Sequence, residues 1–309
     1  MANYSLDKQN NTLEGRLTTI SPSECIAWLT VLCTIGIAIV TVNGLAVIVY
    51  FKEPSLRKRS MYLVISLAVA DMFVGGVSLS IRVFNSGRNC SVWESHLSPA
   101  GESMLIAILF VFAGASVTHL AVISLERVHA TFRPLKHRLL KKWIFGASIA
   151  AAWLIGVINS AYLYLDIIFK LKGPWEFYSY LSLAACCFFI IIVSYSSIVV
   201  KMYCGTYPHY HGAVSRERKL TKTLFIMTLV SSALLLPYIL SYFLIFSKRP
   251  FHAFSRQANH LRFFLVSLVY ANSVVNPIMY AYRMPEFKRA MSSVLGCRPS
   301  AQVFPQSDS

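Results

Sequence analysis

Seven long apolar stretches run along the chain, and short polar segments separate them. A helix needs roughly 20 mostly apolar residues to cross the hydrocarbon core of a bilayer. The apolar residues are continuous instead of alternating, which favours helices over the strands of a membrane β-barrel. We therefore expect membrane-spanning helices at about 26–50, 61–84, 102–126, 143–165, 178–202, 220–246 and 262–282.

A soluble bundle of buried helices is the alternative to a membrane protein. However, the segments 143–165 and 177–200 contain no charged residue, and the whole chain is 56% hydrophobic and 14% charged. This composition leaves too little polar side chain to cover a soluble protein of such size. We predict an all-α membrane protein, with a seven-transmembrane helix bundle over 26–284 between an N-terminal tail (1–25) and a C-terminal segment (285–309).

Lys and Arg are concentrated in alternate segments between the spans. If the N-terminus is outside the cell, most of the 29 basic residues lie on the cytoplasmic side, as the positive-inside rule requires. Glycosylation sequons begin at Asn3, Asn10 and Asn89, and all three then face outward. We expect a multi-pass plasma-membrane protein with an extracellular N-terminus. The net charge of +16 then belongs mainly to a face near anionic lipid and does not indicate a nucleic-acid partner.

The seven cysteines do not form the framework of a small secreted domain. Only Cys25 and Cys90 are expected outside the cell, and the sequence leaves open whether they pair, because it does not fix their distance. Cys33, Cys186 and Cys187 lie within spans, where we expect them to pack as small apolar residues.

Asp71 lies in the middle of the second expected span. A charge at that depth is costly, so its carboxylate should face a cavity or a partner, and a cation or a proton would relieve it. Small polar side chains at comparable depth offer oxygen atoms of the kind that hard cations prefer. The alternative for them is hydrogen bonding between helices. These residues are Asn43, Ser116, Asn272, Ser273 and Asn276.

Each expected span also carries a short motif. The set resembles the signature of rhodopsin-like (class A) G-protein-coupled receptors, and its order along the chain makes coincidence implausible. The motifs are Asn43-Gly44-x-x-Val47, Leu67-Ala68-x-x-Asp71, Glu126-Arg127-Val128, Trp153, Tyr195, Pro237 and Asn276-Pro277-x-x-Tyr280.

The resemblance implies a sodium pocket and an activation switch. Asp71 with Asn43, Ser116, Asn272, Ser273 and Asn276 resembles the family's site for an allosteric sodium ion, and no other cofactor is expected. In the switch, Glu217 would bridge Arg127 in the inactive state, and Pro237 would weaken the sixth helix so that it swings outward. The implied switch residues are Glu126, Arg127, Glu217, Tyr195, Pro237, Asn276, Pro277 and Tyr280.

Family resemblance also implies the partners. A heterotrimeric G protein would insert a helix into the opened cavity beside Arg127, with Pro134 and Leu135 in contact. Arrestin and a receptor kinase are further expected partners, together with an extracellular ligand and the lipid bilayer.

Several positions depart from the family pattern. Glu102 stands where most relatives have a cysteine, and the second outer loop has none, so the usual disulfide there is impossible. Cys187 replaces a proline in the fifth span, and Leu234-Leu235-Leu236-Pro237 replaces the cysteine-tryptophan pair before the sixth-span proline. The loss of this disulfide and of the fifth-span proline resembles the melanocortin, cannabinoid and lysophospholipid receptor group.

The same comparison bears on the ligand. Leu109 occupies the position of the aspartate that pairs with amines, and Tyr270 that of the lysine that binds retinal. An anionic lipid or an acidic peptide suits an apolar pocket below a basic rim of Lys248, Arg249, Arg256 and Arg262. The expected pocket residues are Leu105, Leu109, Phe112, Tyr238, Tyr242 and Phe246.

The segment after the seventh span resembles the family's amphipathic helix along the membrane surface. Phe287 and Leu295 would face lipid there, and Cys297 is a palmitoylation candidate, with a plain free thiol as the alternative.

Other function classes remain open. A secondary transporter should show repeats and paired broken spans, and an enzyme should show a nucleophile, base or metal set; neither pattern is found in the sequence. His119 is alone in its span and is expected to be a hydrogen-bonded core residue. A receptor-like protein without ligand-driven signalling would carry the same motifs.

Overall fold

The computed structural model describes residues 20–56, 61–94, 97–169, 175–204, 226, 229–231, 233–241, 256–283 and 285–294. All regular elements within these residues are helical. Six helices are long and apolar enough to cross a membrane, and a shorter apolar helix, Leu229–Ser241, belongs to the sixth expected span. The prediction of an all-α membrane bundle is confirmed.

The spans are longer than the apolar stretches that predicted them. They are α2 (Pro22–Lys52), α3 (Met61–Phe73) with η2 (Val74–Ser78) and α4 (Leu79–Asn89), α5 (Pro99–Phe132), α7 (Lys142–Phe169), α8 (Trp175–Cys204) and α10 (Arg256–Arg283). The short elements are η1 (Pro54–Leu56), α6 (Pro134–Leu139) and α11 (Pro285–Val294).

Polar caps explain why helices begin before the apolar stretches. At the start of α2, the Ser21 hydroxyl accepts a hydrogen bond from the Glu24 backbone N–H, and the Glu24 carboxylate accepts one from the Ser21 N–H at 3.0 Å. This reciprocal pair satisfies donors that a helix start otherwise leaves without partners. At the start of α5, the Ser98 hydroxyl accepts from Gly101 N–H at 3.2 Å.

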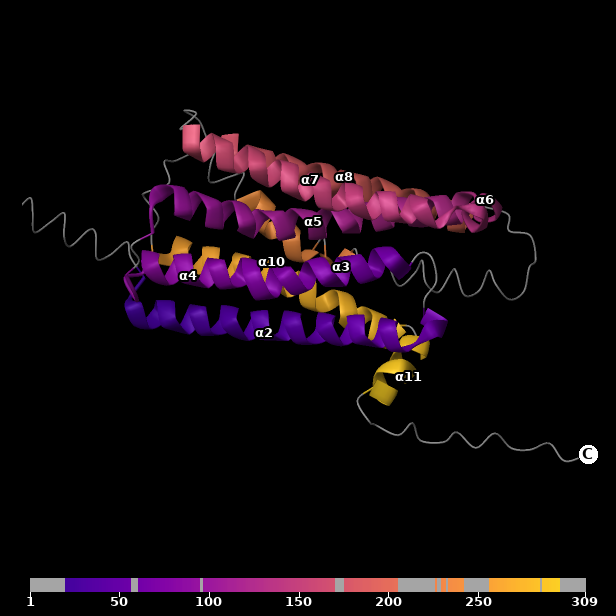
Figure 1. Ribbon diagram of the computed structural model, residues 1–309, viewed down its shortest axis with the longest axis horizontal. Coiled ribbons are helices and arrows are strands. Elements are labelled where there is room, and N and C mark those ends of the chain that lie inside the picture. The colour runs from indigo at the N-terminus through magenta and orange to yellow at the C-terminus, as the bar shows by residue number, and fades with distance from the viewer. Residues whose placement is uncertain are drawn as a thin grey trace, which may run out of the picture.

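The long helices lie side by side, with α2, α3, α4, α5, α7 and α8 nearly parallel in Figure 1 and α11 leaving the bundle at the end where α6 lies. We call that end the α11 end, and the opposite end, which holds Cys90, the disulfide end. Large apolar side chains such as Ile37, Ile158 and Phe189 are exposed on the outside, whereas polar side chains are buried between helices. This arrangement suits a bundle surrounded by lipid.

The cysteines within the spans differ in their packing. Cys187 is buried, as expected, but Cys33 and Cys186 are exposed. Cys33 and Cys186 therefore lie on outward faces of their helices, and of the three only Cys187 packs between helices.

α5 and α7 make a close backbone contact at Gly156. A Cβ atom there would lie 2.7 Å from the Val111 carbonyl oxygen and 3.0 Å from the Ala115 nitrogen. Small residues allow this approach between membrane helices, which have little other driving force to associate.

A π-helical turn interrupts the second span. η2 inserts one extra residue into the helix, which turns all later side chains by roughly 100° relative to a regular α-helix. Gly75 permits close packing there, since a Cβ on it would lie 2.7 Å from the Cβ of Ile39 in α2. The inward face of α4 therefore cannot be extrapolated from the position of Asp71.

Several bonds hold α2 to its neighbours at the disulfide end. Cys25 and Cys90 form a disulfide that joins α2 to the end of α4, which answers the question that the sequence left open. Arg256 of α10 forms an ion pair with Glu24, and the Trp28 indole N–H donates to His260 Nδ1 at 2.9 Å.

An ion pair stands at the start of the third span, where most relatives have a disulfide. Glu102, in the first turn of α5, forms an ion pair with Arg88 of α4. α4 and α5 are thus joined by charges at the place where the family pattern has a cysteine.

α11 packs against α2. The Phe287 ring is 1% exposed, and its centroid lies 5.4 Å from that of Tyr50. The expectation that Phe287 faces lipid is wrong, because its buried ring packs against Tyr50 of α2. Lys288 and Arg289 are exposed, whereas Leu295 and Cys297 lie outside the described residues.

Candidate functional site

Asp71 is fully buried at the centre of the bundle and accepts three hydrogen bonds. The hydroxyls of Ser116 and Ser273 donate to its Oδ1 at 2.6 and 2.8 Å, and the Asn276 amide donates to its Oδ2 at 2.8 Å. These partners come from α5 and α10, so one carboxylate links three spans. No basic side chain is among the hydrogen-bond or ion-pair partners that the described residues give Asp71.

Asn43 and Asn272 complete this polar centre. The Asn43 amide donates to the backbone oxygens of Ile39 and Ser273 at 3.0 and 2.9 Å. The side-chain oxygens of Asn43, Asn272 and Asn276 are buried and accept no hydrogen bond within the described part of the chain.

The oxygen atoms of this polar centre fit a hard monovalent cation. A carboxylate without a basic partner, two hydroxyls and amide oxygens with unused lone pairs are oxygen ligands of the type that such ions bind. Sodium would supply a positive charge that offsets the burial of the Asp71 carboxylate.

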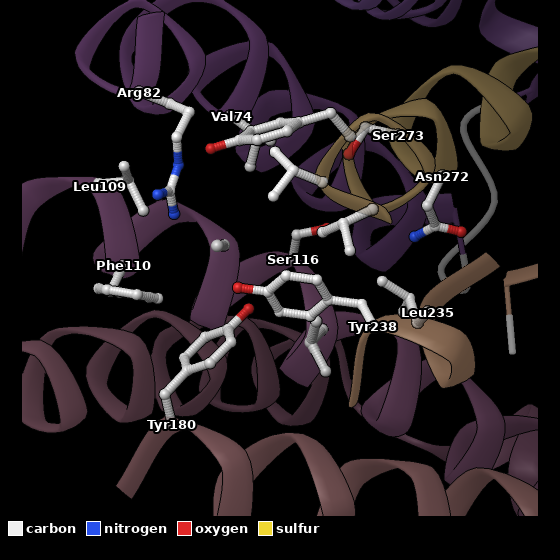
Figure 2. Close-up of a pocket in the computed structure, with 15 residues that line it drawn as sticks. Val74, Arg82, Leu109, Phe110, Ser116, Tyr180, Leu235, Tyr238, Asn272 and Ser273 are labelled. Carbon is white, nitrogen blue, oxygen red and sulfur yellow. The ribbon is translucent and has the colours of Figure 1, made fainter. Parts of the chain in front are cut away.

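A cavity adjoins this centre on the side of the disulfide end. It contains about 570 Å³ of empty space, its open mouth included. Ser116, Asn272 and Ser273 lie on its wall, so the cavity reaches the polar centre around Asp71. The other lining residues are Val74, Arg82, Leu109, Phe110, Ala113, Val117, Tyr180, Leu235, Tyr238, Val266, Val269 and Tyr270 (Figure 2).

The lining differs in part from the pocket expected from the sequence. Leu109 and Tyr238 line the cavity, but Leu105 and Phe112 do not. The Phe112 ring stacks on Phe73, with centroids 4.8 Å apart, and so packs against the second span. The other two expected pocket residues, Tyr242 and Phe246, lie outside the described residues.

Sequence reasoning missed Arg82, which is the one charged residue among the described residues of the lining. Its guanidinium reaches into the cavity from α4, on the side where the hydroxyls of Tyr180 and Tyr238 approach each other (Figure 2). It also hydrogen-bonds the Tyr270 hydroxyl. The signal in the sequence was weak, because Arg82 lies close to the expected end of its span, where a long side chain ordinarily extends to water.

The expected basic rim is only partly described. Arg256 is paired with Glu24, and Arg262 lines a second cavity next to the first. Lys248 and Arg249 fall outside the described residues.

Arg127 lies near the α11 end of α5 and is 3% exposed. Its Nε and Nη2 contact the Glu126 carboxylate, whose other oxygen lies 2.6 Å from Nε2 of His137 in α6. This histidine is a further partner that the motif did not indicate. A buried guanidinium needs such an anionic partner.

The other switch residues are described to different extents. Tyr195 of α8 is 4% exposed, Pro277 lies inside α10 without ending it, and Pro237 lies in the helix Leu229–Ser241. Glu217 and the side chain of Tyr280 fall outside the description.

α6 presents its first residues to solvent beside Arg127. Pro134 begins the helix, and Leu135 is 76% exposed. An apolar side chain so exposed at the α11 end is available to a partner.

The buried His119 belongs to a chain of hydrogen bonds between three spans. The Trp153 indole N–H donates to the Ser66 hydroxyl at 3.1 Å, and that hydroxyl lies 2.8 Å from His119 Nε2. His119 Nδ1 lies 2.7 Å from the Ala115 carbonyl oxygen. Because a carbonyl oxygen only accepts, the Nδ1–H of the neutral ring donates to it, and Nε2 accepts from the Ser66 hydroxyl. The histidine is a hydrogen-bonded core residue, as expected.

The remaining modification candidate in the described region is Asn89. It is exposed in the last turn of α4, next to Cys90. Asn3 and Asn10 lie outside the described residues, and no group of three or more His, Cys, Asp or Glu that could hold a metal occurs among those described.

Comparison with known proteins gives consistent matches. The family model "7 transmembrane receptor (rhodopsin family)" matches residues 42–280. Trace amine-associated receptor 5 of Rattus norvegicus is 25% identical over 90% of this chain and 87% of its own. Melanocortin receptor 5 of Homo sapiens is 25% identical over 99% of this chain and 98% of its own. Adenosine receptor A3 of Ovis aries is 22% identical over 92% and 95%.

Proposed function

Because the chain belongs to the rhodopsin family of seven-transmembrane receptors, we propose that it binds an extracellular ligand in the cavity and activates a heterotrimeric G protein at the α11 end. In this proposal the N-terminus lies outside the cell at the plasma membrane, and the exposed Asn89 carries a glycan. Arrestin and a receptor kinase would act at the same cytoplasmic end.

The buried contact of Arg127 with Glu126 is the observation that carries this proposal. An arginine held by its neighbour can exchange that partner when the helices around it move, and two arrangements of similar free energy are what a switch requires. Tyr195 and Tyr280 would become its partners after activation, with Glu217 as its partner before.

The ligand would act on the sixth span through its wall of the cavity. Leu235 and Tyr238 line the cavity on either side of Pro237. Proline lacks the backbone N–H that would bond to the preceding turn, so the helix bends more easily there. A ligand that binds better when this wall is displaced favours an outward position of the helix, which opens a groove for a G-protein helix beside Arg127, Pro134 and Leu135.

Sodium at Asp71 is part of the same proposal. Asp71 and Ser116 would hold the ion, with Ser273 and the amide oxygens of Asn272 and Asn276 nearby. The ion would stabilise the inactive arrangement only if it binds that arrangement more tightly than the active one.

The ligand in this proposal is an anionic lipid or peptide instead of an amine. An amine needs a carboxylate partner, and none of the residues that line the cavity in the described part of the chain is acidic. The positive charge of Arg82 in the lining supports a preference for an anionic ligand.

Nucleotide exchange on a panel of purified G proteins tests the proposed activity. Membranes that contain the receptor should accelerate exchange on at least one G protein, and Arg127→Ala should remove the acceleration. Lys142→Ala, which removes an exposed positive charge at the start of α7, is the matched control and should leave exchange unchanged. An acceleration that survives Arg127→Ala would contradict the mechanism, and a silent panel would favour a receptor-like protein without signalling.

A further inference from the structure

Two cavities share Arg82 in their linings. The first is the cavity above the Asp71 centre, and the second lies between α2, α4 and α10 at the disulfide end. Arg82 and Val266 line both. The residues that line only the second are Ile20, Leu32, Asn85, Ser86, Asn89, Cys90, Asn259, Arg262 and Phe263.

The charge of both linings has one sign. Arg82 and Arg262 are basic, and none of the described residues lining either cavity is Asp or Glu. The described linings thus contain basic side chains and no acidic ones, a composition that complements an anion and disfavours a cation.

Phenol hydroxyls lie in the same cavity as the Arg82 guanidinium. The side chains of Tyr180 and Tyr238 point their hydroxyls toward each other (Figure 2), and Tyr270 is the hydrogen-bond partner of Arg82. A guanidinium presents a planar fork of N–H donors that matches two oxygens of a carboxylate or phosphate. Phenol hydroxyls can donate to the same oxygens.

The rest of the first cavity is apolar. Leu109, Phe110, Val117, Leu235 and Val269 form much of its wall. A strongly polar molecule would lose its hydration there without full compensation, whereas an apolar chain gains from burial. The ligand should thus carry its charge at one end.

We propose that this receptor recognises an amphiphile whose single oxyanion, a carboxylate or a phosphate, is held by Arg82, which lines both cavities, with its apolar part in the first cavity. The proposal rests on the proposed receptor function for the role of the cavity and specifies the ligand class for it. Arg262 and the amides of Asn85 and Asn259 would face any polar remainder in the second cavity.

Direct binding to the purified full-length receptor in phosphatidylcholine nanodiscs tests the site without a G protein. The probes are oleate and oleoyl lysophosphatidate as the two anions, methyl oleate as the neutral analogue and oleylamine as the cation. Displaceable binding should occur for at least one anion and be at least about 10-fold tighter than for the ester or the amine. Which anion binds more tightly tells a carboxylate site from a phosphate site.

Arg82→Gln should weaken binding of the anion by about 10-fold or more and leave the weak binding of the ester unchanged. Arg289→Gln, which removes an exposed charge from α11, is the matched control and should bind as the wild type does. If Arg82→Gln does not fold, Arg82→Lys serves instead, since it keeps the charge but loses the planar fork and should retain the preference for the anion with a smaller loss.

The variant Tyr270→Phe tests whether anion binding depends on the charge of Arg82 or on its hydrogen bond to Tyr270. It removes the hydrogen bond to Arg82 and keeps the charge, so anion selectivity should persist. The proposal is overturned if no anion binds the folded wild-type receptor, if the ester binds as tightly as the acid, or if Arg82→Gln weakens acid and ester equally. Anion binding without nucleotide exchange would instead refute the receptor function and keep the site.

Discussion

Asp71 shows how a single residue determines the polar centre of the bundle. Its carboxylate organises Ser116, Ser273 and Asn276 from two other spans, because each donor lowers the cost of a charge removed from water. Two of these donors, Ser116 and Ser273, also line the cavity, so ligand and ion would share a wall.

Replacing Asp71 by asparagine should abolish a dependence of ligand affinity on sodium. In the wild type, exchanging N-methylglucamine for sodium should lower agonist affinity by about 5-fold or more, a usual size for allosteric coupling. The neutral amide of the variant would lack the charge that retains the ion. Competition binding in the two salts measures the effect, and equal sodium sensitivity in wild type and Asp71→Asn would refute the sodium site.

Buried charge was a reliable sequence signal only at mid-span. Asp71 lies far from both ends of its apolar stretch, so its role followed from the cost of burial. Arg82 lies two residues inside the expected end of the same stretch, where a long side chain ordinarily extends to water. The side chain turns into the bundle instead, and apolar periodicity carries no information about that choice.

At the scale of elements, the number and order of the spans could be predicted because lipid requires long apolar helices. Their ends could not, since caps such as Ser21 and Ser98 extend a helix beyond its apolar residues. The rotation of a helix about its own axis, which decides the side chains that face the cavity, could not be predicted either. Leu109 and Phe110 of α5 line the cavity while Phe112 packs on Phe73, so the true face is turned from the expected one.

The close contact between α5 and α7 at Gly156 predicts that a larger side chain there destabilises the receptor. Gly156→Ala should lower the melting temperature of the purified receptor, because its Cβ would lie 2.7 Å from a backbone oxygen that moves only with the whole of α5. Gly146→Ala on the same helix is the control, since its Cβ would meet nothing within 4 Å. Alanine favours a helix over glycine by about 1 kcal/mol, so the control should melt no lower than the wild type. Equal melting of the two variants would disprove the close contact.

At the scale of the whole molecule, the disulfide end is held by covalent and ionic links to α2. Cys25–Cys90 closes a loop with a sequence separation of 65 residues. A chain-entropy model assigns about 4 kcal/mol to a loop of that size. That figure is an upper bound here, because the two spans remain helices within the bilayer after the bundle has come apart.

The double variant Cys25→Ser, Cys90→Ser should therefore melt below the wild type by less than this bound implies. Reductant should lower the melting temperature of the wild type and leave that of the variant unchanged. Cys33→Ser with Cys186→Ser is the matched control, since both thiols are exposed on outward faces. A wild type whose melting does not respond to reductant would show that the bond contributes nothing.

The placement of this bond also bears on biosynthesis. Both cysteines belong to the first two spans, so in the proposed topology the disulfide can form once these two spans have been inserted and their outer ends meet the oxidising lumen. A bond between the third span and the second outer loop would instead have to wait for later helices. A nascent chain released before the third span is made should already contain the crosslink, and its first hairpin would enter assembly as a finished unit.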